Sequence, residues 1–192
     1  MVGAVLAQST SWSNAEKAIR ALKCAGFLSP KAIRKLDQKS LAKLIKPSGY
    51  YNSKALTLRT LMEHVGIRFR DDLDVASRSD AVTLRTELLL VRGIGKETAD
   101  DILLYAFGKP VFVIDSYTKR LFYRLGLAPE NADYELYAEL FTNILPSDPD
   151  LFGEYHALIV AHASSTCKKT PECVNCCLLD LCPTGATYVT NH

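Results

Sequence analysis

One short segment combines residue types that could bind a phosphate group. Gly93 and Gly95 flank Ile94, and Lys96 follows directly. Glycines permit positive φ and the close approach of another backbone, and the amides at a helix start bind phosphate oxygens. Lys96 would add positive charge beside those amides. The segment therefore predicts a phosphate contact, although a plain connection between two helices carries the same short pattern.

A second group of reactive residues lies near the C-terminus, where five of the six cysteines gather. Four of them follow the spacing C-x5-C-x2-C-x5-C: Cys167, Cys173, Cys176 and Cys182. In a reducing compartment such a group is more typical of metal binding than of disulfides. Four thiolates so close together can hold an iron–sulfur cubane, and zinc accepts the same ligands. Because Cys177 lies next to Cys176, the spacing alone does not decide which of the two is the third ligand.

Helices must position these groups, because apolar residues recur mostly at helical spacing. We expect helix starts at Ser29, with Pro30 as the first helical residue, and at Ser40. The apolar run 111–114 is too isolated for a sheet and is predicted to be a buried linker. Further helices are predicted from Thr83 to Gly93, Lys96 to Phe107, Asp115 to Gly126, Tyr134 to Ile144 and Asp150 to Ala163. The expected fold class is all-α.

Composition and charge narrow the class of protein. The chain has 192 residues, 48% of them hydrophobic and 23% charged, which is ordinary for one or two globular domains. A net charge of +2 excludes a strongly basic coat protein, so any DNA contact must come from a local basic face. Neither a membrane-spanning run nor a signal peptide is present, which predicts a cytoplasmic protein without a membrane partner.

The wider sequence around the glycines resembles a known family. The string LLLVRGIGKETADDILLYAFGKPVFVIDSYTKRLFYRLG is similar to the helix-hairpin-helix and Gly/Pro-Asp region of the endonuclease III superfamily of DNA glycosylases. Gly108, Pro110 and Asp115 stand at the family's G-x-P turn and aspartate. Residues 7–10 and 45–55 match two further motifs of the family, in the expected order. The resemblance covers nearly the whole chain.

The resemblance implies a two-domain helix-hairpin-helix glycosylase fold with a cysteine-rich iron–sulfur loop at the C-terminus. Residues 1–109 would form a helical barrel domain with the hairpin. Residues 110–192 would form a helical domain with the aspartate and the cysteine loop. The first residues, 2–7, look like the end of a buried helix without a cap, so we expect that an N-terminal helix is missing.

The cysteine spacing resembles the loop that holds a [4Fe-4S] cluster in this family. The first gap is five residues here and six in the family, whereas the last two gaps agree. Agreement of the last gaps favours Cys176 over Cys177 as the third ligand. The implied role of the cluster is structural, since it would hold Lys168 and Lys169 near the DNA backbone, and zinc is the alternative. We expect His156 and His162, on the preceding helix, to be packing or capping residues.

The resemblance also implies the chemistry. Asp115 stands where the family has the carboxylate that stabilises positive charge on the sugar of a flipped nucleotide and orients or deprotonates water. Asp is also a preferred N-cap residue, and both roles can hold at once. Members that cut the strand carry a lysine where this chain has Glu97, and Lys96 lies roughly 100° around the helix from it. We therefore predict a glycosylase without lyase activity.

Glu97 also makes the string similar to the 3-methyladenine DNA glycosylase III branch, which removes N-alkylated purines. A carboxylate there would favour a cationic base, although an exposed first-turn glutamate also suits the helix dipole. Trp12 would stack on the flipped base, with a core position as the alternative, and Gln8 would fill the gap that the base leaves. Tyr50 would enter the duplex as a wedge. The predicted DNA-binding residues are Gln8, Trp12, Tyr50, Gly93, Gly95, Lys96 and Thr98.

These expectations define one leading hypothesis. The chain would act as a monomer on double-stranded DNA that contains a damaged base, in the cytoplasm or nucleoid of a prokaryotic cell, with Asp115 and Glu97 at the reacting base. A mismatch or oxidised-base glycosylase and an endonuclease III-like lyase are alternatives within the fold. A non-catalytic binder of distorted DNA is the alternative from another class.

Overall fold

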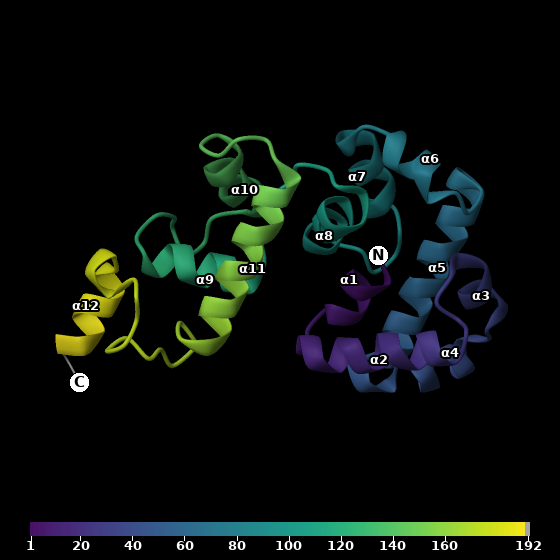
Figure 1. Ribbon diagram of the computed structural model, residues 1–192, viewed down its shortest axis with the longest axis horizontal. Helices are drawn as coiled ribbons and strands as arrows, with labels where there is room; N and C mark the ends of the chain where they lie inside the picture. The colour runs from purple at the N-terminus through teal and green to yellow at the C-terminus, as the bar shows by residue number, and fades with distance from the viewer. Residues whose placement is uncertain (191–192) are drawn as a thin grey trace. The chain divides into compact units, whose positions relative to one another are not determined.

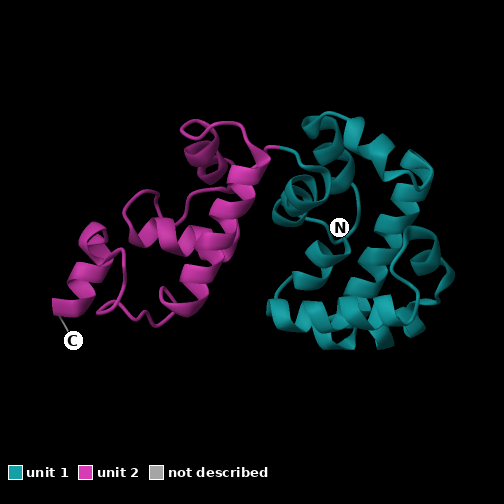
Figure 2. Cartoon of the chain, viewed as in Figure 1, with its two compact units in different colours: residues 1–109 teal, residues 110–192 magenta. Residues whose placement is uncertain are grey.

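The computed structural model describes residues 1–190, and all of their regular structure is helical, which confirms the all-α prediction. The chain divides into two compact units, Met1–Lys109 and Pro110–His192 (Figure 2). Each unit is described by itself below. None of the described helices is long and apolar enough to cross a bilayer.

The first unit is built around one long central helix. Helix α5 packs against α3 and α4 and also contacts α1 and α6, so its buried residues form much of the core (Figure 1). The glycine segment connects α7 to α8, which pack on each other. The elements are α1 Val2–Ala7, α2 Trp12–Cys24, α3 Pro30–Lys35, α4 Gln38–Leu44, a 3-10 turn Lys46–Ser48, α5 Tyr51–Phe69, α6 Leu73–Arg78, α7 Ala81–Leu89 and α8 Lys96–Phe107.

The helix starts follow capping chemistry more than apolar spacing. Ser29 caps α3 with Pro30 as its first residue, as predicted. The predicted starts at Ser40 and Thr83 are wrong, because Asp37 and Asp80 cap those helices and accept hydrogen bonds from amides of the first turn. An aspartate three residues before a candidate serine or threonine offers an ionised acceptor to the free amides. The helices therefore start earlier than their apolar periodicity indicated.

The second unit begins with an extended linker and is held together by aromatic side chains. Residues 110–114 form no regular structure, and Phe112, Val113 and Ile114 are buried, which confirms the predicted buried linker. Phe112 stacks on Phe141 with ring centroids 3.6 Å apart, and Phe152 meets it edge-on. The elements are α9 Ser116–Arg124, α10 Tyr134–Thr142, α11 Pro149–Ser165, a 3-10 turn Leu179–Leu181 and α12 Pro183–Thr190.

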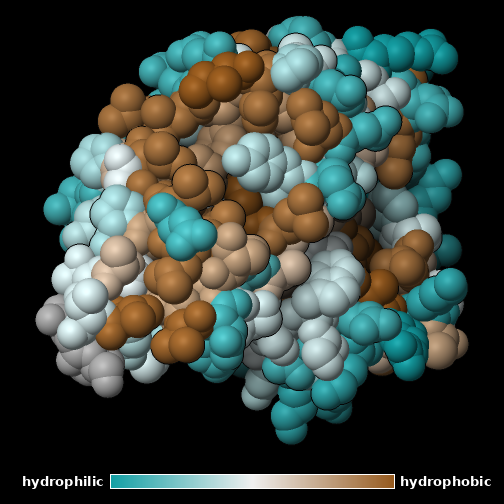
Figure 3. Space-filling view, turned by 60° about the vertical axis from the view of Figure 1, so that its left-hand side comes forward, coloured by the Kyte–Doolittle hydropathy of each residue, from teal (hydrophilic) through white to brown (hydrophobic). Residues whose placement is uncertain are grey.

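Both units expose some large apolar side chains. Ile67 and Val82 are examples in the first unit, and Ile144 and Leu181 in the second. On the face drawn in Figure 3, apolar residues fill much of the central part and hydrophilic residues lie toward the margins. Apolar atoms form a large share of every protein surface, so such residues do not by themselves define a site.

Candidate functional site

The connection between α7 and α8 is a tight hairpin. Val91 and Ile94 are buried, and the Ile94 amide donates to the Val91 carbonyl over 3.0 Å. Gly93 has φ +88°, a conformation that favours glycine. The isoleucine therefore anchors the turn in the core, while the glycines beside it stay exposed.

The two glycines are needed for different reasons. A Cβ at Gly93 would lie 2.1 Å from the Thr57 hydroxyl oxygen, so α5 leaves no room for a side chain there. Gly95 is the N-cap of α8, and nothing lies within 4 Å of the place where its Cβ would be. Gly95 has no side chain to cap the α8 amides, and such amides at a helix start are a typical binding site for an anion. Lys96 and Glu97 are exposed in the first turn.

Gln8 links the end of α1 to this hairpin. Its side-chain amide nitrogen donates to the Gly93 carbonyl over 3.0 Å and to the Thr98 hydroxyl over 2.9 Å. Thr98 is buried, so its side chain points into the unit and holds Gln8. Gln8 and Thr98, both predicted to bind DNA, are 90 positions apart in the sequence. One hydrogen bond joins them directly.

Both aromatic candidates are exposed. The Trp12 side chain is 64% exposed, so the alternative of a core tryptophan is wrong. Part of its ring lies against α1, since Cη2 would be 3.8 Å from a Cβ at Gly3. Tyr50 is 73% exposed and has left-handed backbone angles, φ 42° and ψ 30°, at the N-cap of α5. Tyr51, the next residue, is half-buried.

A buried lysine supports the Gln8 and Tyr50 segments together. The Lys54 ammonium donates to the Leu6 carbonyl over 2.9 Å and to the Ser48 carbonyl over 2.7 Å. Burial lowers its pKa. Lys54 belongs to the motif at 45–55, but its spacing alone carries no sign that the side chain turns inward.

In the second unit, Asp115 is the N-cap of α9. Its Oδ1 accepts a hydrogen bond from the Thr118 amide over 2.7 Å, so the capping role that the sequence allowed is present. Its Oδ2 lies 3.5 Å from His156 Nε2, and both side chains are nearly buried. Burial alone raises the pKa of Asp115, but the interactions with His156 and the Thr118 amide outweigh it and hold the pKa below its ordinary value. The geometry therefore keeps a buried carboxylate ionised at neutral pH.

The pairing of Asp115 with His156 was missed at the level of sequence. His156 was expected to be a packing or capping residue of α11, because no spacing relates it to another polar group. The side chain is on the buried face of α11, and that face packs on α9. Only the packing of two helices brings the ring to the carboxylate.

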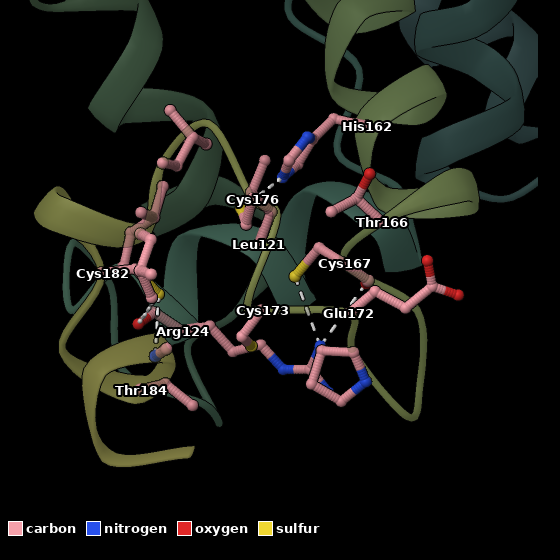
Figure 4. Close-up of a pocket in the computed structure, with 15 residues that line it drawn as sticks. Leu121, Arg124, His162, Thr166, Cys167, Glu172, Cys173, Cys176, Cys182 and Thr184 are labelled. Atoms are coloured by element: carbon pink, nitrogen blue, oxygen red, sulfur yellow. Dashed lines mark hydrogen bonds between the residues drawn. The ribbon is translucent and has the colours of Figure 1, made fainter. Parts of the chain in front are cut away.

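The four spaced cysteines line one pocket in the second unit (Figure 4). Cys177 is exposed and is not among the lining residues. His162, from α11, lies beside the pocket with Nε2 3.7 Å from the Cys176 sulfur. Burial raises the pKa of Cys173, and the neighbouring thiols raise it further. The fold thus brings the four spaced thiols around one pocket.

Two arginines of α9 fix the backbone at the first cysteine. Arg120 donates to the Cys167 carbonyl over 2.9 Å and to the Ala163 carbonyl over 2.8 Å. Arg124 reaches the Cys167 sulfur at 3.3 Å and the carbonyls of Lys168 and Lys169 at 2.6 and 2.9 Å. These contacts tie the cysteine loop to α9, whose other end carries the carboxylate.

Relatives and solved structures agree with this architecture. The chain is 43% identical over 183 residues to a putative DNA repair glycosylase of Methanocaldococcus jannaschii, covering 95% of this chain and 83% of that protein. A 3-methyladenine DNA glycosylase of H. pylori bound to 1,N6-ethenoadenine is 30% identical, with a TM-score of 0.73, over 85% of this chain and 82% of that one. A trapped endonuclease III–DNA covalent intermediate shares the fold, with a TM-score of 0.83 at 22% identity, over 98% and 84% of the two chains.

Residues 2–147 match the family model of the HhH-GPD superfamily of base excision DNA repair proteins. The match spans the hairpin and Asp115, two of the features on which the resemblance rested. This chain therefore belongs to the HhH-GPD superfamily and is a DNA glycosylase of the endonuclease III type.

Proposed function

We propose that the chain hydrolyses the N-glycosidic bond of N-alkylated purines in duplex DNA, with Asp115 as the catalytic carboxylate. The observation that carries the proposal is the state of Asp115: nearly buried, held ionised, and with one oxygen bound to a helix amide. Positive charge develops on the sugar as the bond breaks. An ionised carboxylate at low dielectric stabilises that charge more strongly than water does.

The reaction needs no covalent intermediate with the protein. The bond between C1′ and the base breaks, and its electron pair leaves with the base. A purine nucleotide that is alkylated at a ring nitrogen carries a positive charge on its base, so the base departs as a neutral molecule and needs little acid assistance. A water oxygen then bonds to C1′, and the Asp115 carboxylate orients that water and accepts its proton.

In this proposal, residues of the first unit bind the duplex DNA. The amides at the start of α8, with Gly93, Gly95 and Lys96, would hold a phosphate. Tyr50 would enter the duplex as a wedge, and its exposure and position at a helix start support this. Trp12, exposed on one side, would stack on the flipped purine.

Gln8 would occupy the gap that the flipped base leaves, with its amide held by the hairpin. The Thr98 side chain is buried, so we propose that Thr98 acts through its backbone amide and through Gln8. The H. pylori relative supports a purine substrate, since its structure is bound to 1,N6-ethenoadenine.

Glu97 supports a glycosylase without lyase activity, because a carboxylate cannot form a Schiff base with the sugar. Lys96 is exposed but lies one residue earlier, roughly 100° around the helix. Borohydride reduction should therefore trap no covalent complex with damaged duplex. Trapping with wild-type protein, abolished by Lys96→Ala, would instead support the lyase activity that the endonuclease III intermediate illustrates.

The cysteine pocket fits a [4Fe-4S] cluster held by Cys167, Cys173, Cys176 and Cys182. Among residues 1–190, no group of three or more His, Cys, Asp or Glu side chains is arranged to hold a single metal ion, and zinc, which also accepts four thiolates, is the alternative. When bound, the cluster would act structurally. It would hold the loop so that the exposed Lys169 lies at the DNA backbone. Arg124 supports this loop, because it donates a hydrogen bond to the Lys169 carbonyl.

The test is release of free base from a panel of duplexes that contain an N-alkylated purine, an oxidised purine, an oxidised pyrimidine or a mismatch. We expect release from the alkylated duplex, strand cleavage only after alkali, and loss of release in Asp115→Asn with duplex binding kept. A preference for an oxidised base or a mismatch would favour another specificity of the same fold. Full activity of Asp115→Asn would overturn the mechanism, and binding without any release would favour a non-catalytic binder.

A further inference from the structure

We propose that His156 is a positioning residue for the reaction, which holds the second oxygen of Asp115 toward the sugar. The proposal rests on the function proposed for Asp115 and adds a residue from another helix to it. Oδ1 of Asp115 is fixed by the Thr118 amide at 2.7 Å, and Oδ2 lies 3.5 Å from His156 Nε2. One oxygen thus accepts the bond of the helix cap, and the other faces the histidine.

The position of His156 in α11 is unusual for a polar side chain. The buried residues of this helix are Phe152, His156, Ile159 and Ala163, which recur at helical spacing along one face. Three of the four are apolar. An imidazole on such a face loses its hydration, and this loss is offset only where the ring meets a polar partner. The Asp115 carboxylate lies within reach of Nε2.

The chemistry requires that the carboxylate be both charged and oriented. A single bond from the α9 amide fixes Oδ1 but leaves rotation about the bond that carries the carboxyl group. A ring N–H directed at Oδ2 restrains that rotation. An imidazole N–H that reaches Oδ2 orients the carboxylate without taking its charge, which stays available for the developing sugar cation.

The distance of 3.5 Å is longer than an ordinary N–H to O hydrogen bond, which spans about 2.7–3.2 Å. Catalytic hydrogen bonds are often long before the substrate binds and shorten in the reacting complex. A small rotation of either side chain closes the difference. The burial of both groups, 10% exposed for His156 and 13% for Asp115, makes the contact a local one with little competition from solvent.

A pair of nearly isosteric variants tests the role. His156→Gln keeps an N–H donor on a side chain of suitable length, whereas His156→Met has similar length and no donor. We expect His156→Met to lower the single-turnover rate of base release about 10- to 100-fold, in line with the loss of alignment at a reacting centre. His156→Gln should retain at least about tenfold more of that rate. The Kd for an uncleavable duplex should stay unchanged in both.

Two controls separate alignment from packing. Ile159→Ala removes apolar volume one turn further along the same face, so it should lower Tm while the rate of the folded protein stays near wild type. In an Asp115→Asn background, His156→Met should have no further effect on the residual rate, because the group it positions is absent. Equal rates for His156→Met and His156→Gln, or a further loss in that background, would overturn the proposal.

These outcomes also distinguish this inference from the proposed function. If Asp115→Asn abolishes base release but His156→Met matches wild type, the carboxylate mechanism stands and the positioning role fails. If Asp115→Asn remains active, the proposed function of the carboxylate fails first, and the role of His156 fails with it.

Discussion

Gly93→Ala is a severe test of the hairpin geometry, because two independent costs can be worked out from the structure. Gly93 has φ +88°, where a residue with a Cβ is strained by about 1–2 kcal/mol. The new methyl would also lie 2.1 Å from the Thr57 hydroxyl oxygen and 3.2 Å from its Cβ and Cγ2. Thr57 is buried on α5 and cannot leave that space without disturbing the core. Overpacking of this kind costs about 1–3 kcal/mol.

The two costs together predict that Gly93→Ala lowers the free energy of unfolding of the first unit by about 2–5 kcal/mol. Each kcal/mol corresponds to about 4 °C in Tm for a domain of this size. Urea unfolding followed by far-UV circular dichroism measures the change. Gly95→Ala is the matched control. Its Cβ would meet nothing within 4 Å and its φ is −97°, so we expect about 0.5–1 kcal/mol, the cost of alanine at an N-cap.

A double-mutant cycle with Thr57→Ala separates strain from overlap. In the Thr57→Ala background the oxygen and Cγ2 that clash are gone, so Gly93→Ala should cost only the backbone strain of about 1–2 kcal/mol. The coupling between the two positions should therefore be about 1–3 kcal/mol. Additive effects, with coupling below about 0.5 kcal/mol, would refute the reasoning, because they would show that the hairpin does not depend on close approach to α5.

Three further predictions concern other parts of the molecule. Lys54→Met should lower the free energy of unfolding by about 1–3 kcal/mol in urea titrations, because it leaves two carbonyl acceptors without their donor; an unchanged midpoint would contradict that bond pattern. Glu87→Gln should lower Tm at pH 7, and the difference from wild type should shrink as pH falls through the folded pKa of Glu87, which Arg68 holds below its ordinary value. A difference that is the same at acidic and neutral pH would contradict the pairing. Cys182→Ser should remove iron and the visible absorption of the purified protein, whereas Cys177→Ser should keep both. If only Cys177→Ser loses iron, the assignment of Cys182 as a ligand and Cys177 as a free thiol is wrong.

Local chemistry made much of the fold predictable. Apolar periodicity and the punctuation by glycine and proline indicated an all-helical chain, and the apolar run before Asp115 was correctly identified as a buried linker. Where two local signals competed, the periodicity misled: α4 and α7 begin after Asp37 and Asp80, and not at Ser40 and Thr83. Caps depend on which acceptor reaches the free amides, and an ionised aspartate is the stronger acceptor.

Contacts between segments far apart in the sequence could not be predicted from apolar periodicity or helix capping. The bond from Gln8 to Thr98 and the burial of Lys54 join pieces of the first unit that lie far apart in the sequence. The exposure of Trp12 likewise could not be decided from its position at a helix start. Each depends on how helices pack, which a spacing of residues along one helix does not specify.

Asp115 shows which features of a site the sequence determines and which only the tertiary structure determines. The sequence by itself determined that an aspartate follows a buried linker and opens a helix, because N-capping involves only residues three positions apart. Only the tertiary structure decided that His156, on a helix more than thirty residues further along, faces the other carboxylate oxygen and that burial surrounds both. A cap is a local geometry, whereas the environment that sets the charge and orientation of a carboxylate is assembled from every element that packs around it.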